Sequence, residues 1–221
     1  GKGIPTATGQ AWDDVENLGG TRHHFRQAII DLSATTRLIR ELDWTAVTGG
    51  TGLDPDQIHY AGISLGGIIG AEVAGIDPHY RAMLLNVAGA GLVDLLRESL
   101  TFSGQLTSGL NAKGIREDTD EYDAFVNAAR WVLDEIDPVN LARFAKRAPL
   151  NGAAPKKLRL QMAVGDSVVP NSSTRRLVTV TGIDEATEFR SFIGSHGFLA
   201  DPVEPACYVG QDDMASFLED N

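Results

Sequence analysis

The stretch Gly62-Ile63-Ser64-Leu65-Gly66 decides the fold of this 221-residue chain. It has the form G-x-S-x-G. Residues 57–61 before it predict a short strand, and residues 67–74 after it predict a helix with many small side chains. A serine on such a sharp turn has a strained backbone, and Cβ atoms at the flanking glycines would collide with the strand and the helix. The helix N-terminus that follows favours negative charge beside the serine.

Composition restricts the possible functions. The net charge is −11, which argues against a nucleic-acid partner and against adsorption to anionic lipid, since both require basic patches. No run of about 18 apolar residues is present, so the sequence predicts no transmembrane helix. Cys207 is the single cysteine, and two interpretations stay open for it: a packed or partly exposed thiol, or a disulfide to a segment outside this chain.

Strand and helix patterns alternate along the chain. Residues 1–20 predict a loop, and Thr21 is the predicted N-cap of a helix that ends before Gly49. Besides the strand at 57–61, the predicted strands are 81–88, 157–164 and 188–193. Besides the helix at 67–74, the predicted helices include 120–136, 172–180 and 212–219. This alternation predicts an α/β fold with a mostly parallel sheet and helices on both faces.

Three reactive side chains follow predicted strands in the order Ser64, Asp166, His196. Because the carboxyl ends of parallel strands meet at one edge of a sheet, we expect these side chains to converge. A serine hydroxyl needs a base to take its proton, which His196 can do, and a carboxylate such as Asp166 can orient the imidazole. The backbone N–H of Leu65 is the expected donor to an oxyanion.

Each of these assignments has a simpler alternative. The glycine motif could be accidental in a chain with 24 glycines, and Asp166 could merely cap a turn. Asp184 and Asp201 are rival acids, but neither directly follows a predicted strand. The other histidines lie in predicted helix, strand or turn positions: His23, His24, His59 and His79. No metal-ligand spacing is present, and a phosphate-binding loop would require a lysine beside the glycines, so the sequence predicts no metal and no cofactor.

The serine turn at 62–66, called the elbow below, and the Asp166 and His196 loops resemble the α/β-hydrolase fold esterases and lipases from about residue 21 to the end. Four motifs more narrowly resemble bacterial extracellular lipases of the virulence-factor (Pla-1/cef) type: the motifs at 22–32, 62–68, 137–140 and 165–171. Ile63 departs from that pattern, since many lipases carry histidine there, and His23 and His24 depart as well. The resemblance implies small-molecule or lipid ester substrates and an extracellular or cell-envelope location.

The resemblance also implies two features of domain organisation. Enzymes of this fold have several strands before the elbow, so we expect residues 1–221 to be the C-terminal portion of one α/β-hydrolase domain. A preceding segment or chain would then supply about four strands and the second oxyanion donor. Residues from about 90 to 150 are expected to form a helical cap, or lid. There Leu92, Leu95 and Leu96 could line an acyl site or belong to the core.

Three functional hypotheses follow. The first is a serine hydrolase that cleaves carboxylic esters through an acyl-enzyme. The second is a serine peptidase or thioesterase on the same scaffold. The third is a non-catalytic hydrolase-like module that needs the preceding segment.

Overall fold

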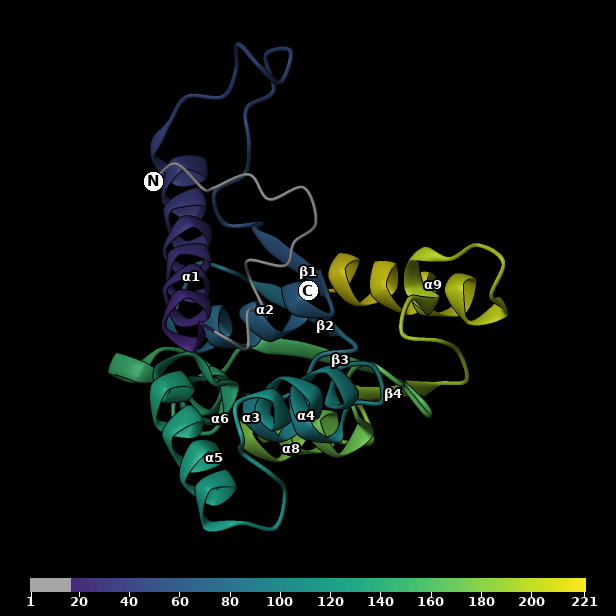
Figure 1. Cartoon of the computed structure of the whole chain (residues 1–221). Coiled ribbons are helices and arrows are strands. Elements are labelled where there is room, and N and C mark those ends of the chain that lie inside the picture. Colours follow the sequence, from purple (N-terminus) through teal and green to yellow (C-terminus); the bar gives the residue numbers. More distant parts are fainter. Residues whose placement is uncertain (1–16) are drawn as a thin grey trace.

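The computed structural model describes residues 17–221, which form one parallel sheet with helices around it (Figure 1). The four strands stand in the order β1-β2-β3-β4, and all three pairings are parallel. They are β1 His59–Ile63, β2 Ala82–Asn86, β3 Lys157–Ala163 and β4 Phe189–Phe192. Successive strands are joined by crossovers that contain helices, as parallel pairing requires. The fold predicted from the sequence is confirmed.

Nine α-helices lie among the described residues. They are α1 Leu18–Glu41, α2 Leu65–Ile76, α3 Leu92–Glu98, α4 Ser103–Ala112, α5 Asp120–Leu133, α6 Pro138–Leu141, α7 Arg143–Lys146, α8 Asn171–Thr181 and α9 Pro205–Glu219. Short 3-10 turns occur at Asp134–Ile136, Leu150–Gly152 and Phe198–Ala200.

The two faces of the sheet bury separate apolar layers. Met83 and Leu85 of β2 pack into the main core, which α1, α2, α3, α5 and α8 also line. Ala82 and Leu84 point to the opposite face, where Phe217 of α9 packs. Figure 1 shows α9 on this side, away from the other long helices. Because both faces of β2 are apolar and covered, the strand reads as a continuous hydrophobic run.

One polar pair interrupts these layers. Asn86 and Gln161 are register partners on β2 and β3, and Asn86 Nδ2 donates to Gln161 Oε1 at 2.9 Å. Gln161 Nε2 in turn donates to the Gly210 carbonyl and to Asp213 Oδ2 of α9, each at 2.9 Å. Asp213 also pairs with Arg159 of β3. The sheet and α9 are therefore joined by hydrogen bonds as well as by apolar packing.

The β1 strand is an edge of the described sheet, since it pairs with β2 alone. Ala61 and Ile63 of β1 are exposed, and the Ile63 side chain keeps 39% of its accessible surface. Ile63 is the register partner of Asn86, which faces α9, so α9 covers this face of β2 but leaves β1 open.

Two helix boundaries differ from the sequence prediction. The N-cap predicted at Thr21 is wrong: α1 begins at Leu18, and the Asn17 side chain accepts the Gly20 N–H at 3.0 Å. Asn is among the strongest N-caps, and packing of α1 against α2 and α5 outweighs the low helix propensity of two adjacent glycines. The predicted last helix starts earlier, because Pro205 occupies the first helical turn. Most of the loop predicted for residues 1–20 lies outside the described residues.

The segment between β2 and β3 contains α3 to α7. Of these, α6 and α7 pack against α2 and α8 beside the sheet, whereas α5 packs against α1 and α3. In Figure 1, α5 extends away from the sheet, at the lower left.

Candidate active site

Ser64 stands on the turn between β1 and α2 with a backbone conformation that L-residues rarely adopt. Its φ is 54° and its ψ is −119°, and its N–H donates to the Asn86 carbonyl at 2.9 Å. Such strain persists because the surroundings over-determine it. A Cβ on Gly62 would lie 2.5 Å from the Gly66 carbonyl oxygen, so Gly62 has to be glycine. The Tyr60 hydroxyl donates to that same carbonyl at 2.6 Å and fixes the turn from the strand side.

The structure brings Ser64, Asp166 and His196 together in a chain of hydrogen bonds. His196 Nε2 lies 2.7 Å from Ser64 Oγ, and His196 Nδ1 lies 2.7 Å from Asp166 Oδ2. An ionised carboxylate only accepts, which assigns the proton to Nδ1 and leaves Nε2 free to accept the serine hydroxyl proton. The arrangement therefore places a hydroxyl, an imidazole and a carboxylate in one hydrogen-bonded series.

Asp166 is held by its own loop. Its Oδ1 accepts the N–H groups of Val168 and Val169, at 2.8 and 3.0 Å, which leaves Oδ2 for His196. The Asp166 side chain is 2% exposed and the His196 side chain 19%. Asp166 therefore caps its own turn with Oδ1 and contacts His196 with Oδ2.

Asn171 is a supporting residue that sequence reasoning missed. Its Oδ1 accepts the Gly165 N–H and its Nδ2 donates to the Ala163 carbonyl, so it closes the loop that carries Asp166. An Asn at the start of a helix is normally read as a cap, and here α8 begins at this residue. No sequence signal distinguishes the two uses.

The rival acids are engaged elsewhere. Asp184 Oδ1 accepts the N–H groups of Ala186 and Thr187, and Asp201 Oδ1 accepts the N–H of Val203. Leu65 is the first residue of α2, a position whose backbone N–H has no acceptor within the helix. The oxyanion role of this N–H stays a prediction.

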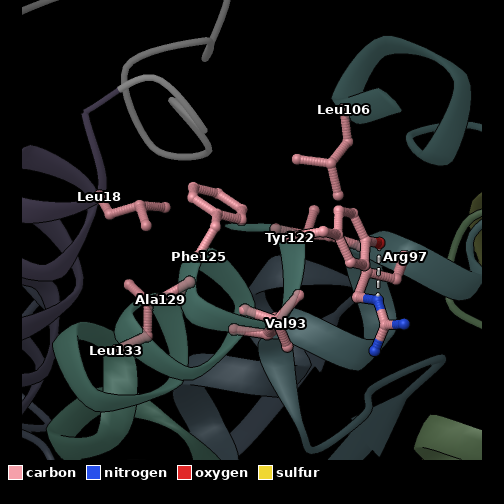
Figure 2. A pocket seen from close by; sticks show the side chains of 10 residues that line it. Leu18, Val93, Arg97, Leu106, Tyr122, Phe125, Ala129 and Leu133 are labelled. Carbon is pink, nitrogen blue, oxygen red and sulfur yellow. Dashed lines mark hydrogen bonds between the residues drawn. The ribbon is translucent and has the colours of Figure 1, made fainter. Parts of the chain in front are cut away.

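The three leucines predicted for an acyl site lie in and beside the main core. Leu92 and Leu95 are buried there, and Leu96 is partly buried against it. Leu96 also lines a small apolar pocket between α3, α4 and α5, and Figure 2 shows its neighbours Val93, Tyr122 and Phe125. The pocket measures about 10 Å³, close to the space of one water molecule, and Arg97 Nε closes one side by donating to the Tyr122 hydroxyl. The acyl-site role of these leucines stays a prediction.

Within residues 17–221, no three His, Cys, Asp or Glu side chains are grouped so that they could hold a metal ion. Within the same range, no helix combines the length and apolarity needed to cross a bilayer. Cys207 is buried, and its thiol donates to the Leu199 carbonyl.

No protein-family model and no curated protein sequence matches this chain. Solved structures do match. Acetyl xylan esterase 1 from Thermoanaerobacterium sp. JW/SL YS485 is 17% identical with a TM-score of 0.59, and the match covers 99% of this chain and 60% of that one. The esterase Est2 from Thermogutta terrifontis is 18% identical with a TM-score of 0.51, with 87% and 64% covered.

A third match is Porphyromonas gingivalis dipeptidyl peptidase 4, at 15% identity and a TM-score of 0.53, which covers 87% of this chain and 22% of that one. The chain thus spans about 60% of the length of the two esterases. At such low identities the likeness concerns the fold. Together with the parallel sheet and the strained serine turn, it shows that this chain has the α/β-hydrolase fold.

Proposed function

We propose that the chain is a serine hydrolase that cleaves carboxylic esters through an acyl-enzyme. The observation that carries the proposal is the hydrogen-bonded series Ser64–His196–Asp166 at 2.7 Å for both contacts, on a serine with a φ of 54°. A nucleophile, a base and an orienting group within hydrogen-bond reach are what activation of a serine requires. Esters are the proposed class because two of the matching structures are esterases.

Each of the three side chains has a role in the proposed reaction. Ser64 Oγ attacks the ester carbonyl carbon while its proton passes to His196 Nε2, and Asp166 stabilises the imidazolium that forms. The carbonyl oxygen becomes an oxyanion beside the Leu65 N–H. His196 then returns the proton to the departing alcohol, which leaves the acyl group on Ser64. A water molecule, deprotonated by His196, then attacks the acyl carbon, the bond to Ser64 Oγ breaks, and His196 returns the proton to Ser64 Oγ as the acid leaves. The proposed reaction uses no cofactor.

Substitutions at the site test the proposal. Ser64→Ala should abolish labelling by a fluorophosphonate and lower kcat by several orders of magnitude, since the members of such a group act as a unit. Asp166→Asn should lower kcat by about 10⁴-fold because the wrong histidine tautomer is favoured. Ser108→Ala is a matched control, since Ser108 is exposed on α4. Ester hydrolysis by Ser64→Ala near the wild-type level would overturn the assignment. Peptide and thioester substrates, assayed in parallel, test the second hypothesis from the sequence.

We further propose that another polypeptide segment of the same hydrolase completes the domain, with residues 1–221 as its C-terminal portion. Two observations support this proposal: β1 is an edge strand with Ala61 and Ile63 exposed, and the matching esterases have a third or more of their length outside the match. The segment would pair with β1 and supply the second oxyanion donor. Full ester hydrolysis by purified residues 1–221, with no other polypeptide present, would refute the idea.

The narrower assignments are proposals as well. The motif at 137–140 and the loop at 165–171 support a lipase-like hydrolase. Their residues hold the structure around the site: Asp137 accepts the N–H groups of Gly91 and Leu92, and Asn171 closes the Asp166 loop. An extracellular or cell-envelope location and a movable cap over 90–150 belong to the same proposal. Hydrolysis of a graded series of acyl esters would test the lipase assignment, and localisation of the protein in its native cell would test the location.

A further inference from the structure

The loop that carries His196 is held by hydrogen bonds to an acidic side chain that is not one of Ser64, Asp166 and His196. Glu204 lies directly before α9, and its Oε2 accepts the Ser195 N–H at 2.8 Å. Its other oxygen, Oε1, accepts the Ser195 hydroxyl proton. The carboxylate therefore binds one residue through both its backbone and its side chain, and that residue is the immediate neighbour of His196.

The Ser195 hydroxyl links these hydrogen bonds to the residue that follows His196. Ser195 Oγ accepts the Gly197 N–H at 3.2 Å. The residue before His196 is thus bonded to Glu204 directly, and the residue after it through the Ser195 hydroxyl. Since two flanking peptide units set the position of a Cα atom, Glu204 restrains the backbone from which the imidazole extends towards Ser64.

The backbone that carries Glu204 is held in place by the packing of α9, which begins at the next residue. Ala206 and Phe217 of α9 are buried in the apolar layer on that face of the sheet, together with Phe198. A Cβ on Gly194 would lie 2.8 Å from Glu204 Oε2, so the loop backbone approaches the carboxylate as closely as glycine permits. Among the described residues, Glu204 takes part in no ion pair within 4.0 Å, so both oxygens serve the loop.

From these contacts we infer that Glu204 is a positioning residue for His196, an inference that rests on the proposed serine hydrolase function. The Glu204 carboxylate makes its hydrogen bonds to Ser195 and not to Ser64 or Asp166. It acts through Ser195, and its task is to hold Nε2 of His196 within hydrogen-bond reach of the Ser64 hydroxyl. Misplacement of a reacting group by about 1 Å costs on the order of 100-fold in rate.

The test compares two substitutions of Glu204 in the full protein. Glu204→Gln keeps an oxygen for the Ser195 N–H and an amide that donates to Ser195 Oγ, so kcat should stay close to the wild-type value. Glu204→Ala removes both contacts and should lower kcat by about 10- to 100-fold with KM unchanged. Asp212→Ala is the matched control, because it removes an exposed acid of α9. Its kcat should equal that of the wild type.

A spectroscopic measurement separates positioning from general loss of stability. The proton on His196 Nδ1, hydrogen-bonded to Asp166, should give a low-field ¹H resonance in the wild type and in Glu204→Gln, and this resonance should weaken in Glu204→Ala. Wild-type kcat and an unchanged resonance in Glu204→Ala would overturn the inference. Equal losses in the Gln and Ala variants would overturn it too, because they would assign the effect to charge.

Two further measurements complete the design. If Glu204→Ala does not fold, Ser195→Ala takes its place, since it removes the hydroxyl link to Gly197 and keeps the N–H bond to Glu204. Its kcat and resonance should fall, and wild-type values in both would refute the inference. If the wild type neither hydrolyses esters nor reacts with a fluorophosphonate, the proposed function fails, while the resonances of the variants still decide the role of Glu204.

Discussion

Glu72 of α2 provides a sharp test of the structure, because its carboxyl group is buried without a partner. The residue is 0% exposed, and neither of its oxygens has a hydrogen-bond partner among the described residues. Burial, and then the negative charge of Asp137, raises the pKa of Glu72 well above its ordinary value of 4.5. Glu72 therefore holds its proton in the folded chain over a pH range in which it would be ionised in the unfolded chain.

The direction and size of the effect follow from proton linkage. Between pH 4.5 and the raised pKa, the folded state binds one proton more than the unfolded state. The free energy of unfolding contributed by Glu72 is therefore fully present below pH 4.5. It is lost as the pH rises towards the folded pKa, by about 1.4 kcal/mol for each pH unit. Glu72→Gln has a similar shape and no ionisation, so its unfolding free energy lacks this slope.

The assay is urea denaturation of the wild type and Glu72→Gln at a series of pH values from 4.5 upwards. The stability of the variant relative to the wild type should rise steadily with pH and then level off at the folded pKa. Glu121→Gln serves as the control, since Glu121 is exposed on α5, and its difference from the wild type should not follow this course. A pH-independent difference between the wild type and Glu72→Gln would refute the burial of an unpaired carboxyl at this position.

Three other substitutions test the packing and electrostatics of the fold. Gly67→Ala should destabilise the fold by about 1–3 kcal/mol, because the added Cβ would lie 2.8 Å from Ala88 Cβ. Thermal unfolding measures this loss, and parallel fluorophosphonate labelling shows whether the Ser64 turn moves too. Phe198→Ala should lower the free energy of unfolding by about 3–5 kcal/mol, since this ring is fully buried directly after the His196 loop. Urea denaturation measures the loss, and an unchanged midpoint would contradict that burial. Burial lowers the pKa of Lys156 from 10.5 to about 8, so the unfolded chain binds more protons between those values and Lys156 makes stability rise over that range. In Lys156→Met this rise should disappear, and a retained rise would assign it to another group.

The sequence was informative where chemistry and periodicity coincide. Ser64, Asp166 and His196 each follow a strand, and the carboxyl ends of parallel strands must share an edge, so their convergence could be inferred without coordinates. Their catalytic roles stay predictions until the variants are measured. Helix ends were less predictable, as the start of α1 at Leu18 shows, because tertiary packing extends a helix through residues of low propensity.

Long-range side-chain contacts could not be predicted. Glu204 and Ser195 are nine residues apart, and their contact depends on how the chain between them folds back, through the 3-10 turn Phe198–Ala200. Asn171 presented the same difficulty, since its residue type suits a helix cap equally well. The unpartnered state of Glu72 was also hidden, because a glutamate among small helix residues gives no sign of complete burial.

The Asn86–Gln161 pair has a consequence for how the chain finds its sheet. All five residues of β2 are buried, so its apolar pattern does not distinguish one alignment with β3 from the next. A slip by one residue would turn Gln161 away from Asn86 and leave two amides in an apolar layer without partners, at a cost of about 1–3 kcal/mol each. The Asn86 carbonyl also accepts the Ser64 N–H, so the residue whose side chain favours one alignment of β2 with β3 also holds the backbone of Ser64 in place.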